Sequence, residues 1–67
     1  MYHRKKRCVI YPKDIQLITG RSARHAQDVV AKIKRLLQKR SDQYVTVHEF
    51  SDFSGIPLEL VMQFIDD

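Results

Sequence analysis

The sequence is poor in the residues on which disulfide-rich, collagen-like and membrane proteins depend. Its 67 residues include one cysteine, two glycines, two prolines and no tryptophan. The single cysteine, Cys8, has no internal disulfide partner, so we expect a reducing, cytoplasmic environment. No uncharged stretch is longer than six residues, whereas about 20 apolar residues are needed to span a bilayer. We therefore expect no membrane segment, and the basic N-terminus lacks the apolar stretch of a signal peptide.

The sequence also lacks the residue clusters that mark a metal centre or an active site. His3, His25 and His48 are far apart, and none of them belongs to a cluster of cysteines or carboxylates with the spacing of zinc ligands. Two glycines are too few for a phosphate-binding loop. Cys8 has no neighbouring histidine that could act as its base. We predict a protein that is not an enzyme and that uses no metal or cofactor.

Charged residues are divided unevenly along the chain. All twelve lysines and arginines lie in residues 1–40 with only two acids, Asp14 and Asp28, which gives this part a net charge of +10. Residues 41–67 hold six acids and no lysine or arginine. Such a split favours a polyanionic partner for the first part. The alternative is that the two parts neutralise each other, within one chain or across a dimer.

The first helix is predicted to run from Pro12 to about Thr19. Proline suits the first position of a helix, and Gly20 is well placed to end this one in a left-handed conformation. The residues expected to face inward are Ile15 with Ile18 or Leu17.

A longer second helix is predicted from an N-cap at Ser22 to Lys39 or Arg40. Apolar residues recur in this segment at intervals of three and four, which is typical of one buried stripe. The stripe comprises Ala23, Ala26, Val29, Val30, Ile33, Leu36 and Leu37.

The second half of the chain predicts another pair of helices. Thr46 and Glu49 fit a capping box, so a helix should cover residues 47–53 and stop at Gly55. Pro57 should start a fourth helix. The side chains expected in the core from these two helices are Phe50, Phe53, Leu60 or Val61, Phe64 and Ile65.

The two halves resemble each other at an offset of 35 residues. The matching pairs are Asp14/Glu49, Ile15/Phe50, Ile18/Phe53, Thr19/Ser54, Gly20/Gly55, Ala26/Val61 and Val29/Phe64. We therefore predict a mostly α-helical fold, with four helices in two helix-turn-helix-like units around one core. The β-prone residues 44–47 could pair with residues 9–11 as a minimal two-stranded β-ribbon. Residues 1–7 are expected to form a flexible basic arm and residues 8–67 a single helical domain.

Residues 12–31 contain a turn glycine with apolar residues at characteristic distances from it. Ile15 lies five residues before Gly20, and Ala26 and Val29 lie six and nine residues after it. This pattern resembles the helix-turn-helix superfamily of DNA-binding domains. It departs from the small and apolar residues usual in that family at Gln16 and Arg21. The whole chain is also similar to short uncharacterised bacterial proteins.

The resemblance implies DNA binding through the second helix of the motif. In such folds its N-terminal residues meet base edges, while nearby cations hold phosphates. Arginine and glutamine can bond guanine and adenine in a bidentate fashion. The predicted contacts on this segment are Arg21, Ser22, Arg24, His25, Gln27, Lys32, Lys34, Arg35 and Lys39. The arm would add Arg4, Lys5, Lys6 and Arg7, either in a minor groove or as a nonspecific tail.

These observations together predict a small DNA-binding protein, a transcriptional regulator or accessory factor. RNA is a further candidate ligand, because charge alone does not distinguish it from DNA. The alternative function is a protein–protein adaptor that uses the acidic, apolar C-terminal helix. Leu58 and Met62 could face such a partner, but simple burial is the favoured interpretation of these two residues. We also expect a homodimer, which is the commonest assembly and suits paired DNA half-sites.

Overall fold

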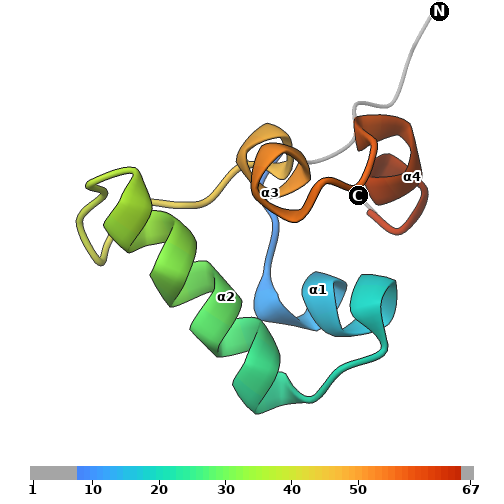
Figure 1. Cartoon of the computed structure of the whole chain (residues 1–67), viewed down its shortest axis with the longest axis horizontal. Helices are drawn as coiled ribbons and strands as arrows, with labels where there is room; N and C mark the ends of the chain where they lie inside the picture. Colours follow the sequence, from blue (N-terminus) through green and yellow to red (C-terminus); the bar gives the residue numbers. More distant parts are fainter. Residues whose placement is uncertain (1–7, 66–67) are drawn as a thin grey trace, which may run out of the picture.

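Four helices in two pairs make up the described part of the chain. The computed structural model describes residues 8–65, and its helices are α1 (Pro12–Thr19), α2 (Ala23–Leu36), α3 (Val47–Ser54) and α4 (Leu58–Gln63). The helix α1 packs on α2, α3 packs on α4, and a smaller contact between α2 and α3 joins the pairs (Figure 1). The predicted mostly helical class is confirmed, and α2 is the longest helix within residues 8–65.

Both pairs begin with an acid that caps the first turn. The Asp14 carboxylate accepts a hydrogen bond from the Tyr11 backbone N–H at 2.9 Å, and Glu49 accepts one from the Thr46 N–H at 2.8 Å. The Thr46 hydroxyl in turn accepts from the Glu49 N–H at 3.1 Å, which confirms the predicted capping box. Each acid thus satisfies a backbone donor that has no partner inside the helix.

Glycine ends the first helix of each pair. The φ angles of Gly20 and Gly55 are 70° and 79°, a left-handed conformation that glycine adopts without a Cβ penalty. In both turns the hydroxyl of the residue before the glycine accepts a hydrogen bond from the N–H of the residue after it, at 3.2 Å. Both predicted helix stops are confirmed, and the similarity of the two halves extends to these hydrogen bonds.

The hydrophobic core lies where the two pairs meet. Ala26 and Val61 occupy corresponding places in the two halves, and both have an exposed fraction of 0%. In α1, Ile15 is buried and Ile18 packs against the core, whereas Leu17 is 59% exposed. The buried apolar residues are Ile10, Ile15, Ala26, Ile33, Val45, Val47, Phe50, Val61 and Ile65.

The segments before α1 and α3 pair at one point. Val9 and Thr46 form an isolated antiparallel bridge, flanked by two backbone hydrogen bonds of 3.0 and 2.8 Å. Residues 8–65 form no strand, so the β-ribbon considered from the sequence is reduced to this bridge.

The helix α2 ends at Leu36 rather than at Lys39 or Arg40 as predicted. Gln38 has a φ of 57°, and the N–H groups of Gln38 and Lys39 donate to carbonyls three and five residues back, at 3.2 and 2.8 Å. These two bonds form a Schellman motif, in which glycine is the usual left-handed residue. Because glutamine stands there instead, the sequence gives no visible stop signal.

Several residues predicted to lie in the core are exposed. The exposed fractions are 65% for Leu36, 49% for Leu37 and 39% for Phe53, and Ala23 is also at the surface. Apolar periodicity identifies one side of each helix correctly. It does not say whether another element covers that side, and within residues 8–65 these side chains remain uncovered.

The helix α4 departs from the prediction at its first residue and at Phe64. It starts at Leu58, with Pro57 as its N-cap. Of the two alternatives Leu60 and Val61, Val61 is the buried one, and Ile65 is buried as expected, but Phe64 is 42% exposed. Leu58 and Met62 pack against the core, as the favoured interpretation of simple burial predicted, rather than facing a partner.

Candidate nucleic-acid interface

The turn that leads into α2 is held by side-chain hydrogen bonds. The Thr19 hydroxyl donates to the Ile15 carbonyl at 2.7 Å and accepts from the Arg21 N–H at 3.2 Å. The Ser22 hydroxyl accepts from the His25 N–H at 3.2 Å, as predicted for an N-cap. These bonds fix the start of α2 relative to α1, which a helix that reads base edges requires.

The first turns of α2 present three polar side chains to solvent. Arg21, Arg24 and Gln27 are all exposed. The Arg24 side chain is 86% exposed, and its Nε lies 3.8 Å from Oδ2 of Asp28, which is also exposed. An exposed pair of this kind contributes about 0 to 1 kcal/mol. Arg24 is therefore free to exchange Asp28 for a ligand.

The outer face of α2 lies opposite its buried residues. A helix turns about 100° per residue, so Arg24, Asp28 and Arg35 lie on the side away from Ala26 and Ile33. Ala31 lies beside them on this face and is exposed. Its small side chain allows a ligand to approach the face closely.

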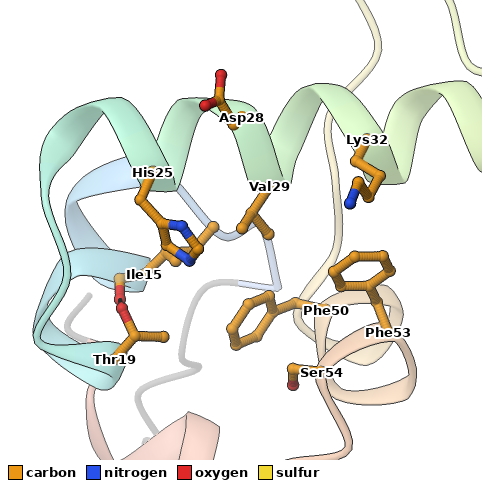
Figure 2. Close-up of a pocket in the computed structure, with 9 residues that line it drawn as sticks. All are labelled: Ile15, Thr19, His25, Asp28, Val29, Lys32, Phe50, Phe53 and Ser54. Carbon is orange, nitrogen blue, oxygen red and sulfur yellow. Dashed lines mark hydrogen bonds between the residues drawn. The ribbon is translucent and has the colours of Figure 1, made fainter.

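His25 and Lys32 lie on a different side of α2, along a cleft between α1, α2 and α3. The cleft has a volume of about 430 Å³ and is lined mainly by apolar side chains. Figure 2 shows His25 beside Ile15 and Thr19 of α1, and Lys32 extending toward Phe53 of α3. His25 is half-buried and Lys32 is exposed. The structure thus places these two predicted contacts on the cleft side of α2, next to the outer face, where Asp28 also lines the cleft.

Two other predicted phosphate contacts are engaged inside the protein. The Lys34 ammonium donates to the Ser41 carbonyl at 2.8 Å. The Lys39 Nζ lies 3.1 Å from Glu49 Oε2, and the two side chains are only 18% and 27% exposed. Lys39 lies beyond the end of α2 and joins the following loop to α3. The Lys34 bond lies at the surface and uses one of its three ammonium donors, whereas Lys39 would have to release Glu49 to bind a phosphate.

The remaining cations of this region differ in their partners. Arg40 pairs with Asp42, Nε to Oδ1, at 3.1 Å, and both are exposed. Arg35 is exposed, and neither it nor Lys32 has an ion-pair partner within residues 8–65. Lys32 and Arg35 are therefore the unpaired cations in the second half of α2.

Glu49 is held in its charged form. Burial raises the pKa of its carboxyl, but the hydrogen bond from the Thr46 backbone and the hydrogen bond and charge of Lys39 outweigh burial. The net effect is a pKa below the ordinary glutamate value. Glu49 is therefore charged at neutral pH, and its 3.1 Å contact with Lys39 joins the loop after α2 to α3.

The sequence did not reveal the cleft or the exposed apolar side chains around Phe53. Periodicity placed Phe53 in the core with Phe50, but Phe53 lines the cleft in front of α3. A second hollow, of about 220 Å³, lies on the other side of Phe53 and is lined by the end of α2. No pattern in the sequence distinguishes a phenylalanine of this kind from a core residue.

The remaining predictions concern the termini and other ligands. The predicted arm contacts Arg4, Lys5, Lys6 and Arg7 lie outside the described residues. No three His, Cys, Asp or Glu side chains of residues 8–65 are grouped as metal ligands are. The helices of the described part are all too short or too polar to cross a membrane.

Comparison of the chain with protein-family models, with curated proteins and with solved structures gave no match. The function is therefore inferred from the geometry and charge of α2 and of the surfaces around it.

Proposed function

We propose that the chain is a small DNA-binding protein, a transcriptional regulator or accessory factor of the cytoplasm, whose α1–α2 pair acts as a helix-turn-helix. Its role is binding rather than catalysis. Double-stranded DNA is the partner, with α2 as the helix that enters the major groove.

The observation that carries this proposal is the exposed triplet Arg21, Arg24 and Gln27 at the start of α2. Arginine can bond guanine O6 and N7 in a bidentate fashion, and glutamine can bond adenine N6 and N7. The backbone N–H groups at a helix N-terminus also favour phosphate. Exposed side chains of the base-reading types and a helix N-terminus that favours phosphate therefore occur together at the turn before α2 and in its first turns.

The placement of the other cations refines which residues would hold phosphates. Lys32 and Arg35 have no ion-pair partner in the described residues, so they can bind a phosphate without losing a contact. Lys34 and Lys39 have partners within the fold. We assign Arg35 to the phosphate backbone, because it shares the outer face of α2 with Arg24, whereas Lys32 lies on the cleft side of the helix. Lys34 and Lys39 are left to the protein itself.

A salt titration of binding to duplex DNA of random sequence tests the proposal. We expect measurable affinity at low salt that falls linearly on a logarithmic scale as salt rises, because each neutralised phosphate releases counterions. The variant Arg21→Ala/Arg24→Ala should bind more weakly and keep its helicity by circular dichroism. A wild-type protein that does not bind duplex DNA at low salt would refute the proposal.

A matched control separates the position of the charges from their number. The double variant Lys13→Ala/Arg40→Ala also removes two cations, from α1 and from the loop after α2, and both residues are exposed. We expect a clearly smaller loss than for Arg21→Ala/Arg24→Ala. Equal losses would show that binding depends only on net charge and would remove α2 as the reader. A preference for hairpin RNA over duplex DNA would reassign the ligand to RNA.

A second candidate function is protein–protein binding through α4. This short helix exposes Leu60 and Phe64 at 47% and 42% and carries exposed Glu59 and no cation. An acidic, partly apolar surface of this kind fits an adaptor. It becomes the leading proposal if the wild-type protein fails to bind nucleic acid at low salt.

A further inference from the structure

Three large apolar side chains gather at the end of α2 and on α3. Leu36, Leu37 and Phe53 are 65%, 49% and 39% exposed. They surround the hollow of about 220 Å³, which Ile33, Glu49 and Asp52 also line. We call Leu36, Leu37 and Phe53 the Leu36–Phe53 patch. Clustered apolar residues of this kind mark interaction surfaces, whereas single exposed ones do not.

One basic and one acidic side chain flank the patch. Lys32 stands on α2 one turn before Leu36, and its side chain extends toward Phe53 (Figure 2). Asp52 stands on α3 next to Phe53 and lines the hollow. Both residues are exposed, and neither has an ion-pair partner within residues 8–65. The two unpaired charges are of opposite sign and flank the same apolar centre.

A surface with this arrangement is complementary to itself. A twofold axis through the patch places Lys32 of one copy opposite Asp52 of the other. The same axis places Asp52 of the first copy opposite Lys32 of the second. The apolar side chains then meet at the centre and the charges lie at the rim, as is usual in protein interfaces. A partner surface of a single charge sign would complement either Lys32 or Asp52, but not both.

We propose that the Leu36–Phe53 patch is the interface of a homodimer with twofold symmetry. A chain this small buries a modest share of its surface alone and gains stability from covering apolar side chains with a second copy. The interface uses the second half of α2, while Arg21, Arg24 and Gln27 lie at its other end. Dimerisation through the patch therefore leaves the proposed DNA-reading residues exposed and does not depend on the proposed function.

Sedimentation velocity of the full chain without DNA, over a series of protein concentrations, tests this interface. We expect a dimer for the wild type and a dissociation constant at least about tenfold higher for Leu36→Ser, because central apolar residues carry much of the binding free energy. Leu17→Ser is the matched control, since Leu17 is 59% exposed on α1 and outside the patch; its dissociation constant should equal that of the wild type. Circular dichroism checks that both variants fold.

A charge-exchange experiment tests the twofold arrangement itself. We expect Lys32→Asp and Asp52→Lys each to weaken the homodimer, because each places like charges opposite one another. Mixed together, the two variants should form a heterodimer in which both opposite-charge pairs are restored. A wild type that stays monomeric, a Leu36→Ser variant that dimerises as well as Leu17→Ser, or a mixture that forms no heterodimer would each overturn the proposal, and a monomer would leave the patch to a different protein.

Discussion

The backbone N–H of Ile10 donates a hydrogen bond to the carbonyl of Val45 at 3.0 Å, and these two residues correspond to each other in the 35-residue repeat. Both are buried, at 3% and 2% exposed. They lie next to the Val9–Thr46 antiparallel bridge. Corresponding segments of the two halves thus run antiparallel to each other. An approximate twofold axis that passes between Ile10 and Val45 therefore relates one segment to the other.

The aromatic residues near the bridge agree with this rotation. Adding 35 to Val9 and Tyr11 gives Tyr44 and Thr46. The rotation therefore converts the Val9–Thr46 pair into a Tyr44–Tyr11 pair. The rings of Tyr11 and Tyr44 are in T-shaped contact, with centroids 6.4 Å apart and an interplanar angle of 85°. The backbone bridge and the ring contact therefore occupy positions that the rotation relates.

The opposed positions of Ile10 and Val45 predict that their volumes compensate. Ile10→Val should cost about 0.5–1.5 kcal/mol through a small cavity, and Val45→Ile about 1–3 kcal/mol through overpacking. The double variant exchanges the two side chains and keeps their combined volume. We expect it to be more stable than the sum of the single effects predicts, as measured by urea unfolding. Strict additivity would show that the two side chains do not share a packing site.

The pH dependence of stability should report on Glu49. Its pKa is lower in the folded protein than in the unfolded chain, where glutamate titrates near about 4.3. The charged carboxylate therefore stabilises the fold above that pH, and this contribution is lost as the pH falls through the lowered folded pKa. We expect the difference in unfolding free energy between wild type and Glu49→Gln to be constant near neutral pH and to shrink below about pH 4.3. A difference that stays constant down to the acid limit would contradict the role of the charge.

The accuracy of the sequence prediction varied with the range of the interaction. The start of α3 and the ends of α1 and α3 depend on residues within three or four positions, so the capping box at Thr46 and the stops at Gly20 and Gly55 were predictable. The end of α2 depends on a left-handed Gln38, and glutamine at that position carries no signal. Local rules identify a helix end only when the residue usual for it is present.

The candidate site was predicted less completely than the helices. The start of α2 follows from the N-cap residue Ser22, and the exposure of Arg24 follows from the periodicity of the helix. The engagement of Lys39 by Glu49 and the exposure of Phe53 depend on how α3 sits against α2. A single sequence gives the polar side of a helix, but it does not give the partners that other elements bring to that side.

The unusual end of α2 predicts a stabilising substitution. Gln38 holds a φ of 57°, which costs a residue with a Cβ about 1–2 kcal/mol. Gln38→Gly should therefore raise the free energy of unfolding by about 0.5–1 kcal/mol, even though glycine also gains freedom in the unfolded chain. Gly20→Ala should lower the free energy of unfolding by about 1 kcal/mol, because the φ of Gly20, 70°, lies in the same left-handed region. No atom lies within 4 Å of an added Cβ, so the loss comes from the backbone conformation and not from a clash. Thermal unfolding of both variants checks the opposite signs, and a shared sign would exclude this explanation.

The last prediction distinguishes base reading from phosphate binding on α2, and it depends on the proposed function. Arg24 projects from the first turns, whereas Arg35 lies on the same face near the end of the helix. Arg24→Ala should cost about 1–3 kcal/mol on a preferred site and reduce the preference for it over other sequences. Arg35→Ala should weaken binding to all sequences alike and reduce the salt slope by about one. Binding titrations at several salt concentrations, on a selected site and on random duplex DNA, measure both quantities.

Lys39 provides the contrast that completes this test. Its ammonium is paired with Glu49 at 3.1 Å and is largely covered, so Lys39→Met should lower the stability of the fold and leave the salt slope of DNA binding unchanged. Glu49→Gln should lower the stability in the same way, because it breaks the same ion pair. If Lys39→Met instead lowers the salt slope by about one and leaves the unfolding free energy unchanged, the lysine releases Glu49 when DNA binds. The phosphate-binding surface would then continue past the end of α2 into the loop that leads to α3.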